Sequence, residues 1–373
     1  MSQSGTLRVG QIGSIAIEVH FTFGLVLLWG AWTGWESIGT FGGAVFGVFA
    51  VLLLFGCVLL HELAHGWQAR AFGLIVRRVI LLPIGGLAQL ETPPSHAGHE
   101  LAIAFAGPFA NLVLGGGLAA FLLIIDPTSL ANPQVQDLVF PRASVDGLIM
   151  YLLGANVLLF AFNMIPAFPM DGGRVLRAGL ALITDYLTAT RFAAWVGRAI
   201  AGAMFVIALV GWPPFSQIPN LPLMILAAVV YVGAQSEEIF VQRRWALARV
   251  NVENVVRPSA DHLSPWEDIS QTLLGRLFTH DRVMPVLVEG RLVGLLTYRE
   301  ARRHASQPAN LTVAHAMRTV FPSLHLRDTL WIALQQMISA RLGALPVVDG
   351  NEFHGMVTLD DVNNAWKYTS RIR

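Results

Sequence analysis

Six long apolar stretches lie before residue 241, and they constrain the fold of this 373-residue chain more than any other feature. A helix crosses a bilayer with about 20 mostly apolar residues. The stretches that approach this length lie at roughly 15–35, 42–65, 101–125, 147–165, 193–212 and 221–240. We therefore predict a mainly α-helical membrane domain over residues 1–240, with six transmembrane helices in contact with the lipid bilayer.

The overall composition agrees with a membrane domain that is followed by a soluble one. The chain is 54% hydrophobic and 13% charged, whereas a soluble domain is about 45–50% apolar and about 25% charged. Charged residues are denser after residue 241. The net charge of +1 gives no electrostatic reason to expect a nucleic-acid partner. The single cysteine, Cys57, excludes a disulfide framework and a zinc site built from cysteines.

The arginines of the connecting loops predict the orientation in the membrane. With six spans, one side receives only Arg142, and this imbalance places both termini in the cytoplasm by the positive-inside rule. The N-terminus lacks the residue order of a cleaved signal peptide, so the first membrane helix would direct insertion. A short N-terminus and a compact design suggest a prokaryotic plasma membrane. The other side receives Arg8, Arg70, Arg77, Arg78, Arg174, Arg177, Arg191, Arg243 and Arg244.

An HExxH motif ends the second apolar stretch, with His61, Glu62 and His65. Residues four apart share one face of a helix, so both imidazoles can reach one metal ion. Zinc accepts histidine and carboxylate ligands, and the glutamate between the histidines can act as general base. So short a motif occurs by chance in many proteins, but ionisable side chains at membrane depth are costly and favour a function.

Asp171 is the best candidate for a third ligand. It follows a proline-broken segment that begins at Asn163 and ends the fourth apolar stretch, on the same predicted side as HExxH. Taken alone, the PMDGG sequence around Asp171 is equally compatible with an ordinary turn.

HExxH together with NxxPxxxxDG on a later stretch resembles the site-2 protease family of intramembrane metalloproteases, over residues 15–240. The resemblance implies that His61, His65 and Asp171 hold one Zn²⁺ and that Glu62 activates water. It also implies that Asn163 orients the carbonyl of the substrate. The expected substrate is a membrane-tethered, often regulatory protein, cut in or next to its transmembrane segment.

Two further segments match that family less strongly. Residues 82–90 favour a short hairpin at the membrane surface that could pair with an extended substrate, although a plain loop explains them equally well. Residues 107–111, GPFAN, supply small residues for close packing of helices, and we interpret them as structural.

The C-terminal region contains an internal repeat with an offset of 61 residues. Residues 252–306 align without a gap onto 313–367, so that the MPV at 284–286 matches the LPV at 345–347. Each copy predicts the order helix, strand, strand, helix. Two such small units pack together as one α/β domain over 252–373, joined to the membrane domain by an amphipathic linker at 241–251.

This repeat resembles a tandem CBS module. The resemblance implies an adenine nucleotide, ATP or AMP, gripped by Thr358 and Asp361 in the second copy. The first copy has Thr297, but it has Glu300 where the family usually has aspartate. A pair that forms a homodimer or packs on the membrane domain without nucleotide is the alternative.

Two other functions remain compatible with these motifs. In a nucleotide-regulated cation transporter or channel, His61, Glu62, His65 and Asp171 would line a metal pathway. That function does not require a glutamate between two ligands, so the spacing favours a protease. A degenerate protease that binds substrates without cutting them is disfavoured because both motifs are intact.

Overall fold

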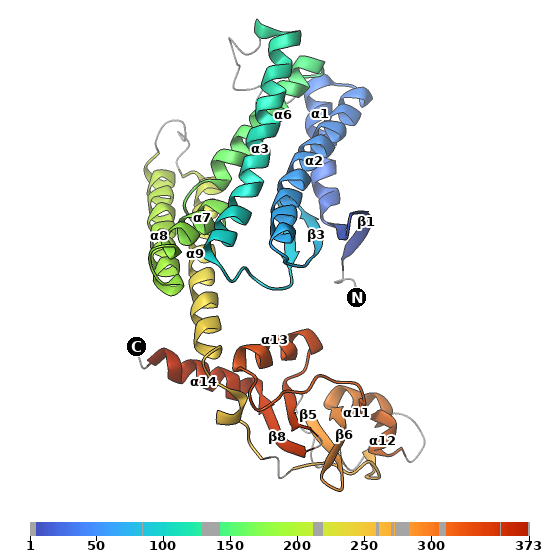
Figure 1. Cartoon of the computed structure of the whole chain (residues 1–373). Coiled ribbons are helices and arrows are strands. Elements are labelled where there is room, and N and C mark those ends of the chain that lie inside the picture. Colours follow the sequence, from blue (N-terminus) through green and yellow to red (C-terminus); the bar gives the residue numbers. More distant parts are fainter. Residues whose placement is uncertain are drawn as a thin grey trace. The chain divides into compact units, whose positions relative to one another are not determined.

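The computed structural model describes residues 5–83, 85–128, 142–211, 219–258, 261–269, 272, 283–305, 311–350 and 352–371. The chain divides into two compact units, Met1–Glu238 and Ile239–Arg373. Each unit has hydrophobic core clusters of its own. Figure 1 labels the helices and strands of both units, coloured along the sequence from blue to red.

Among the described residues, five helices are long and apolar enough to cross a membrane. The preceding helix, α1 (Phe23–Ile38), has 16 residues and is therefore only about 24 Å long, less than the ~30 Å hydrocarbon core of a bilayer. The predicted count of six transmembrane helices is therefore not confirmed. The five helices are α2 (Phe41–Ala71), α3 (Ala97–Ile125), α6 (Val145–Asn163), α8 (Tyr186–Val210) and α9 (Leu221–Leu247).

The first predicted span is wrong at its N-terminal end. Residues Ile15–His20 form strand β2, and the helix starts only at Phe23. The side chains of Ile15 and Ile17 are buried, while Ala16 and Glu18, which alternate with them, are less so; this is the two-residue period of a strand. The apolar content of residues 15–35 hid this change of period.

Helices α1 and α2 pack closely through glycines. A Cβ atom added at Gly34 would lie 2.2 Å from the Gly43 carbonyl oxygen, and one at Gly47 would lie 2.0 Å from the Gly30 carbonyl oxygen. Small residues allow such close approach of helix backbones in membranes. A side chain at either position would therefore separate α1 from α2.

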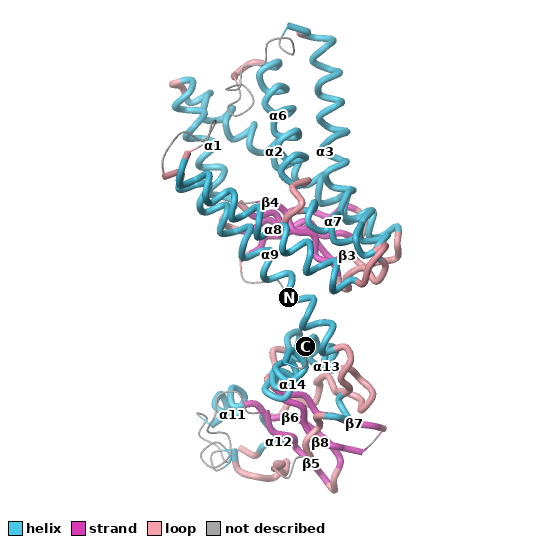
Figure 2. The backbone as a smooth tube through the Cα atoms, turned by 90° about the vertical axis from the view of Figure 1, so that its left-hand side faces the viewer, coloured by secondary structure: helices cyan, strands magenta, loops and turns pink. Residues whose placement is uncertain are grey.

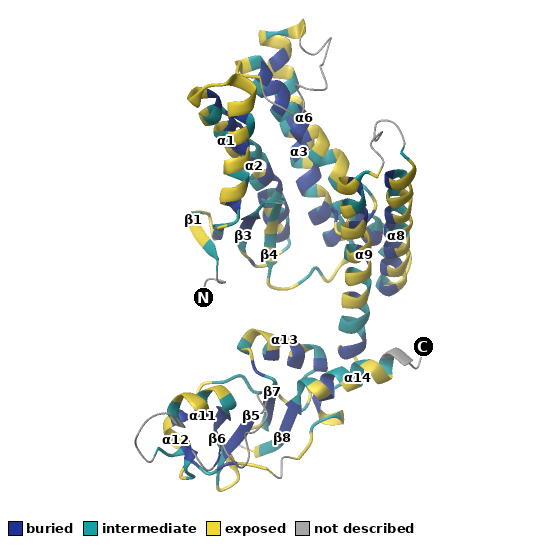
Figure 3. Cartoon of the chain, turned by 180° about the vertical axis from the view of Figure 1, so that it is seen from behind, coloured by how far each residue is buried: buried dark blue, intermediate teal, exposed yellow. Residues whose placement is uncertain are grey.

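The outer faces of the helices in the first unit are exposed (Figure 3), and they carry many large apolar side chains. Leu28, Val113 and Ile225 are each more than half exposed. An apolar surface of this extent is rare on a soluble monomer and is expected where lipid is the solvent.

A four-stranded sheet accompanies the helices of the first unit, in the order β1-β2-β3-β4. β2 pairs with β3 in parallel, and the other neighbours are antiparallel. Figure 2 shows these strands gathered at one end of the helices. β4 lies at an edge of the sheet. The hairpin predicted at 82–90 begins earlier in the chain, at Val76, because its first strand is β3. The remaining strands are β1 (Thr6–Ile12), β3 (Val76–Leu82) and β4 (Gly85–Leu90).

The second unit contains the two hairpins of the repeat. Met284 pairs with Leu296 in the first hairpin, and Leu345 pairs with Val357 in the second, which reproduces the offset of 61 residues. The first helix predicted for the first copy, Ile269 to Phe278, lies mostly outside the described residues. The elements are η1 (Val252–Asn254), β5 (Val283–Val288), β6 (Arg291–Thr297), α11 (Tyr298–Ala305), α12 (Val313–Ala316), α13 (Leu330–Ala340), β7 (Ala344–Asp349), β8 (Glu352–Thr358) and α14 (Leu359–Arg371).

Candidate metal centre

Helix α2 brings two imidazoles together near its C-terminal end. His61 and His65 lie one helical turn apart, and their Nε2 atoms are 3.1 Å from each other. Their exposed fractions are only 6% and 8%. Two imidazole nitrogens that converge in a buried position have the arrangement of ligands for one metal ion.

Asp171 completes this cluster from helix α7 (Asp171–Ala181), of which it is the first residue. Its Oδ2 atom lies 3.2 Å from His61 Nε2 and 3.1 Å from His65 Nε2. The following glycine is required because a Cβ atom at Gly172 would lie 2.3 Å from the Ile165 carbonyl oxygen. The chain therefore folds back tightly just before α7, and this turn presents Asp171 to the histidines.

The geometry of the three residues fits zinc. A tetrahedral zinc ion with bonds of about 2.0–2.1 Å holds its ligand atoms about 3.3 Å apart, close to the 3.1–3.2 Å separations observed. Burial alone would raise the pKa of Asp171, but the adjacent imidazoles of His61 and His65 outweigh it and hold the pKa well below its usual range. Two imidazoles and one carboxylate leave a fourth position for water or substrate.

The Nδ1 atom of each imidazole also forms a hydrogen bond. His65 Nδ1 donates to the Ile103 carbonyl oxygen at 2.6 Å, and His61 Nδ1 donates to Asn111 Oδ1 at 2.5 Å. Asn111 in turn donates to Asn156 Oδ1 at 2.8 Å, and both asparagines are fully buried. These bonds fix the tautomers that leave both Nε2 atoms free to bind metal.

Asn111 and Gly107 belong to the GPFAN segment, which the sequence alone presented as a packing motif. That interpretation is incomplete, since a Cβ atom at Gly107 would lie 2.2 Å from His65 Nε2 and 2.7 Å from His61 Nε2. Helix α3 therefore faces the imidazoles with a residue that has no side chain. The signal in the sequence was an asparagine four residues after a glycine within an apolar stretch.

Glu62 points toward the sheet. Its Oε2 atom accepts a hydrogen bond from the Ala88 N–H of β4 at 3.0 Å. A Cβ atom at Gly86 would lie 2.4 Å from Glu62 Cγ. The edge strand and the carboxylate are therefore in direct contact, and the hairpin at 82–90 is part of the same site.

Asn163 is the last residue of α6, and its side chain is half-buried. Its Nδ2 atom donates to the Leu159 carbonyl oxygen of its own helix at 3.0 Å. Among the contacts of the described residues, none joins Asn163 to the two histidines or to Asp171.

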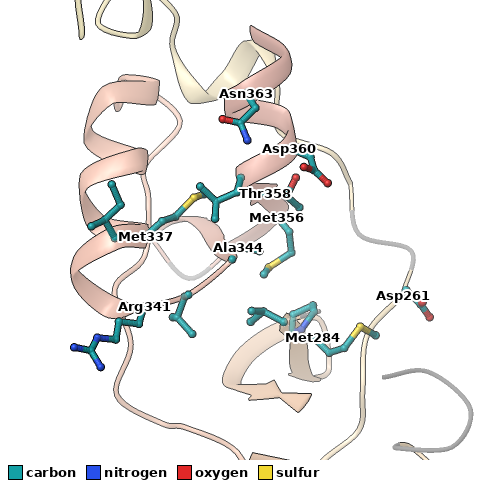
Figure 4. Close-up of a pocket in the computed structure, with 15 residues that line it drawn as sticks. Asp261, Met284, Met337, Arg341, Ala344, Met356, Thr358, Asp360 and Asn363 are labelled. Carbon is teal, nitrogen blue, oxygen red and sulfur yellow. The ribbon is translucent and has the colours of Figure 1, made fainter. Parts of the chain in front are cut away.

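A cavity of about 970 Å³ lies in the second unit, and Thr358, Asp360 and Asn363 line it (Figure 4). Asp361 is buried, and its Oδ2 atom accepts hydrogen bonds from the Thr358 hydroxyl and N–H groups. Its other oxygen forms an ion pair with Arg257 at 2.7 Å. Thr358 thus lies on the cavity wall, whereas Asp361 is not among the described residues that line the cavity.

The first copy repeats the local arrangement of the second. Thr297 donates its hydroxyl and its N–H to Glu300 Oε2, at 2.7 and 3.1 Å. Glu300 also forms an ion pair with Arg318. Thr297 is not among the described residues that line the cavity.

Known proteins resemble both units. The profile of Peptidase family M50 matches residues 49–209, and the CBS domain profile matches residues 313–368. Zinc metalloprotease MJ0392 of Methanocaldococcus jannaschii is 31% identical, with 96% of this chain and 96% of the relative covered. Rip3 of Mycobacterium tuberculosis is 28% identical, with 95% of this chain and 91% of the relative covered. The solved site-2 protease from Methanocaldococcus jannaschii is 33% identical over 62% of this chain and 95% of that chain, with a TM-score of 0.42.

Proposed function

Because the chain belongs to peptidase family M50, the zinc metalloproteases of the site-2 type, we propose that it cuts a peptide bond in or next to a transmembrane segment of another membrane protein. One observation carries the proposal: three side chains that can hold a metal converge at a buried position, two of them on the candidate membrane helix α2 and the third at the start of α7. Family membership favours this hypothesis over a transporter that uses the same residues.

The residues of the site divide the work of hydrolysis among them. A bound zinc ion would supply Lewis-acid chemistry and lower the pKa of a water molecule to about 7. His61, His65 and Asp171 would hold it. Glu62 would take a proton from the attacking water and return it to the leaving amine. The Ala88 N–H, at 3.0 Å from Glu62, holds this carboxylate in place for both transfers.

Strand β4 is well placed to bind an extended substrate. It is an edge strand of its sheet, and its Ala88 N–H donates to Glu62 Oε2. An edge strand is therefore in direct contact with the general base. A substrate that pairs with this edge by β-augmentation would have its backbone unwound, which exposes the carbonyl that a helix hides in its own hydrogen bonds.

Asn163 would orient the carbonyl of the bound substrate. Its amide group now donates to the Leu159 carbonyl oxygen and would turn from there to the substrate. Such a donor acts on the charge that develops in the transition state.

The second unit would regulate the protease by binding ATP or AMP. The cavity supports this role, because its wall combines the Thr358 hydroxyl and Arg341 with the apolar side chains of Met284 and Met356. Arg341 suits a phosphate group, and the methionines suit a purine ring. Asp361 would have to leave Arg257 to reach a ribose. Dimerisation through the repeat is a further part of this proposal.

The cellular setting follows from the charge bias of the loops. We place the protein in a prokaryotic plasma membrane with both termini in the cytoplasm. The expected substrates are membrane-tethered regulatory proteins.

A Glu62→Gln variant tests the proposed chemistry. The parent and the variant are reconstituted in liposomes with a single-span fluorescent peptide whose membrane segment contains an Asn-Pro pair. The parent should cut it, and the variant should keep its zinc and lose cleavage. Equal cleavage by both proteins would contradict the role of Glu62. A peptide with Leu-Leu in place of Asn-Pro is the control for the need to unwind the substrate.

A further inference from the structure

Arg177 is a buried cation that the proposed reaction does not use. It lies on α7 six residues after Asp171, and its side chain is only 5% exposed. A guanidinium keeps its charge in any protein. Since a buried charge is costly unless it is paired, its partners must be an integral part of the structure around α7.

The partners of Arg177 belong to two other helices. Its Nε atom donates to Glu100 Oε1 at 2.9 Å, close to the start of α3. Its Nη1 atom donates to Glu237 Oε1 of α9 at 2.6 Å. A single side chain therefore ties α7 to α3 and to α9.

Two neighbours of the Arg177 side chain, Phe168 and Glu100, lie close in the sequence to residues of the proposed metal site. The guanidinium of Arg177 lies 5.0 Å from the centre of the Phe168 ring, and Phe168 is three residues before Asp171. Glu100 is three residues before Ile103, whose carbonyl oxygen accepts the hydrogen bond of His65. Arg177 thus holds the segment that presents Asp171 and the turn of α3 that orients His65.

Helix α9 also packs directly against the segment just before Asp171. A Cβ atom at Gly233 would lie 2.7 Å from Pro169 Cδ, and Pro169 is two residues before Asp171. Gly233 and Glu237 are four residues apart, so they share one face of α9. This face contacts the turn before α7 at one residue and Arg177 at the other.

We propose that Arg177 is a positioning residue of the metal centre, which fixes Asp171 against the two histidines through its bonds to Glu100 and Glu237. The inference rests on the proposed zinc site. Loosening either bond lets α7 move and weakens the hold of Asp171 on the metal. Loosening the bond to Glu100 also frees the turn of α3 that orients His65. Because Glu237 lies on α9, a shift of α9 would also move Arg177 and, through it, Asp171.

Zinc release from the purified full-length protein to a chromophoric chelator tests this proposal. Glu237→Gln should speed release about tenfold, the lower end of effects at residues that support metal ligands. Glu238→Gln is the matched control, because Glu238 is the next residue of α9 but pairs with Arg198 of α8 at 2.5 Å. The control should release zinc at the rate of the parent.

Variants of Arg177 itself complete the experiment. Arg177→Met alone leaves the buried Glu100 unpaired and can unfold the protein, so it is combined with Glu100→Gln. This double variant should release zinc faster than the parent and change the visible spectrum of the cobalt-substituted protein. Arg177→Lys should restore part of the slow release, because an ammonium group can keep one of the two bonds.

The outcomes separate this inference from the proposed function. Equal release by folded Glu237→Gln, Glu238→Gln and parent proteins, with unchanged cobalt spectra, would overturn the positioning role and leave the zinc site intact. A parent that binds no zinc or cobalt would overturn the proposed site, and with it this inference.

Discussion

Replacing Asn111 by alanine should weaken zinc binding, although Asn111 is not itself one of the proposed metal ligands. Asn111 is fully buried and accepts the His61 Nδ1–H bond at 2.5 Å. Loss of such a partner costs about 10- to 100-fold in metal affinity, which corresponds to about 1.4–2.7 kcal/mol. The imidazole of His61 would then be free to rotate or to change its tautomer.

The same substitution should lower the stability of the fold by a separate amount. It leaves His61 Nδ1–H and Asn156 Oδ1 without their partner. A buried polar group that loses its partner costs about 1–3 kcal/mol. The free energy of unfolding is measured in metal-free protein, so that this cost is not confused with the loss of zinc affinity.

Asn156→Ala is the matched control for Asn111→Ala. It removes the acceptor of Asn111 but leaves the bond between Asn111 and His61. Competition with a chelator of known affinity gives the zinc dissociation constant of each variant. The Asn111 variant should bind zinc at least about tenfold more weakly than the Asn156 variant. Equal affinities in two folded variants would refute the role given to Asn111.

Three further substitutions test other parts of the site. Gly107→Ala should abolish tight zinc binding, checked by metal content, because its Cβ atom would lie 2.2 Å from His65 Nε2; a variant with full zinc content would contradict the packing described. Gly86→Val should keep zinc but lose peptide cleavage in liposomes, since its Cβ atom would lie 2.4 Å from Glu62 Cγ. Undiminished cleavage would contradict the close contact between β4 and Glu62. Thr358→Val should weaken AMP binding in calorimetry about fivefold, the loss of one hydrogen bond of about 1 kcal/mol, and unchanged binding would remove Thr358 from the nucleotide site.

Part of the metal centre could be predicted because its signal is local. His61 and His65 lie four residues apart on one helix, and this spacing alone brings their side chains together. Asp171 was identified from a motif 106 residues after His65, so its role came from resemblance to a family. No local pattern relates an aspartate to histidines at that distance.

Other parts depend on contacts that the sequence does not reveal. Strand β2 exists because Ile17 pairs with Val79, about sixty residues away, and an apolar content suited to a membrane helix concealed it. Asn111 belongs to the candidate site because it hydrogen-bonds to His61, which lies 50 residues before it in the sequence. Asp361 is buried and pairs with Arg257, which precedes it by about a hundred residues.

Measuring metal content decides whether the proposed zinc site exists, because this measurement needs no known substrate. The detergent-solubilised protein and a His65→Ala, Asp171→Ala double variant are purified, and zinc per chain is determined by elemental mass spectrometry. We expect about one tightly held zinc ion per chain in the parent and little in a variant that remains folded. Absence of zinc from both proteins after reconstitution, or equal zinc in both, would contradict this expectation.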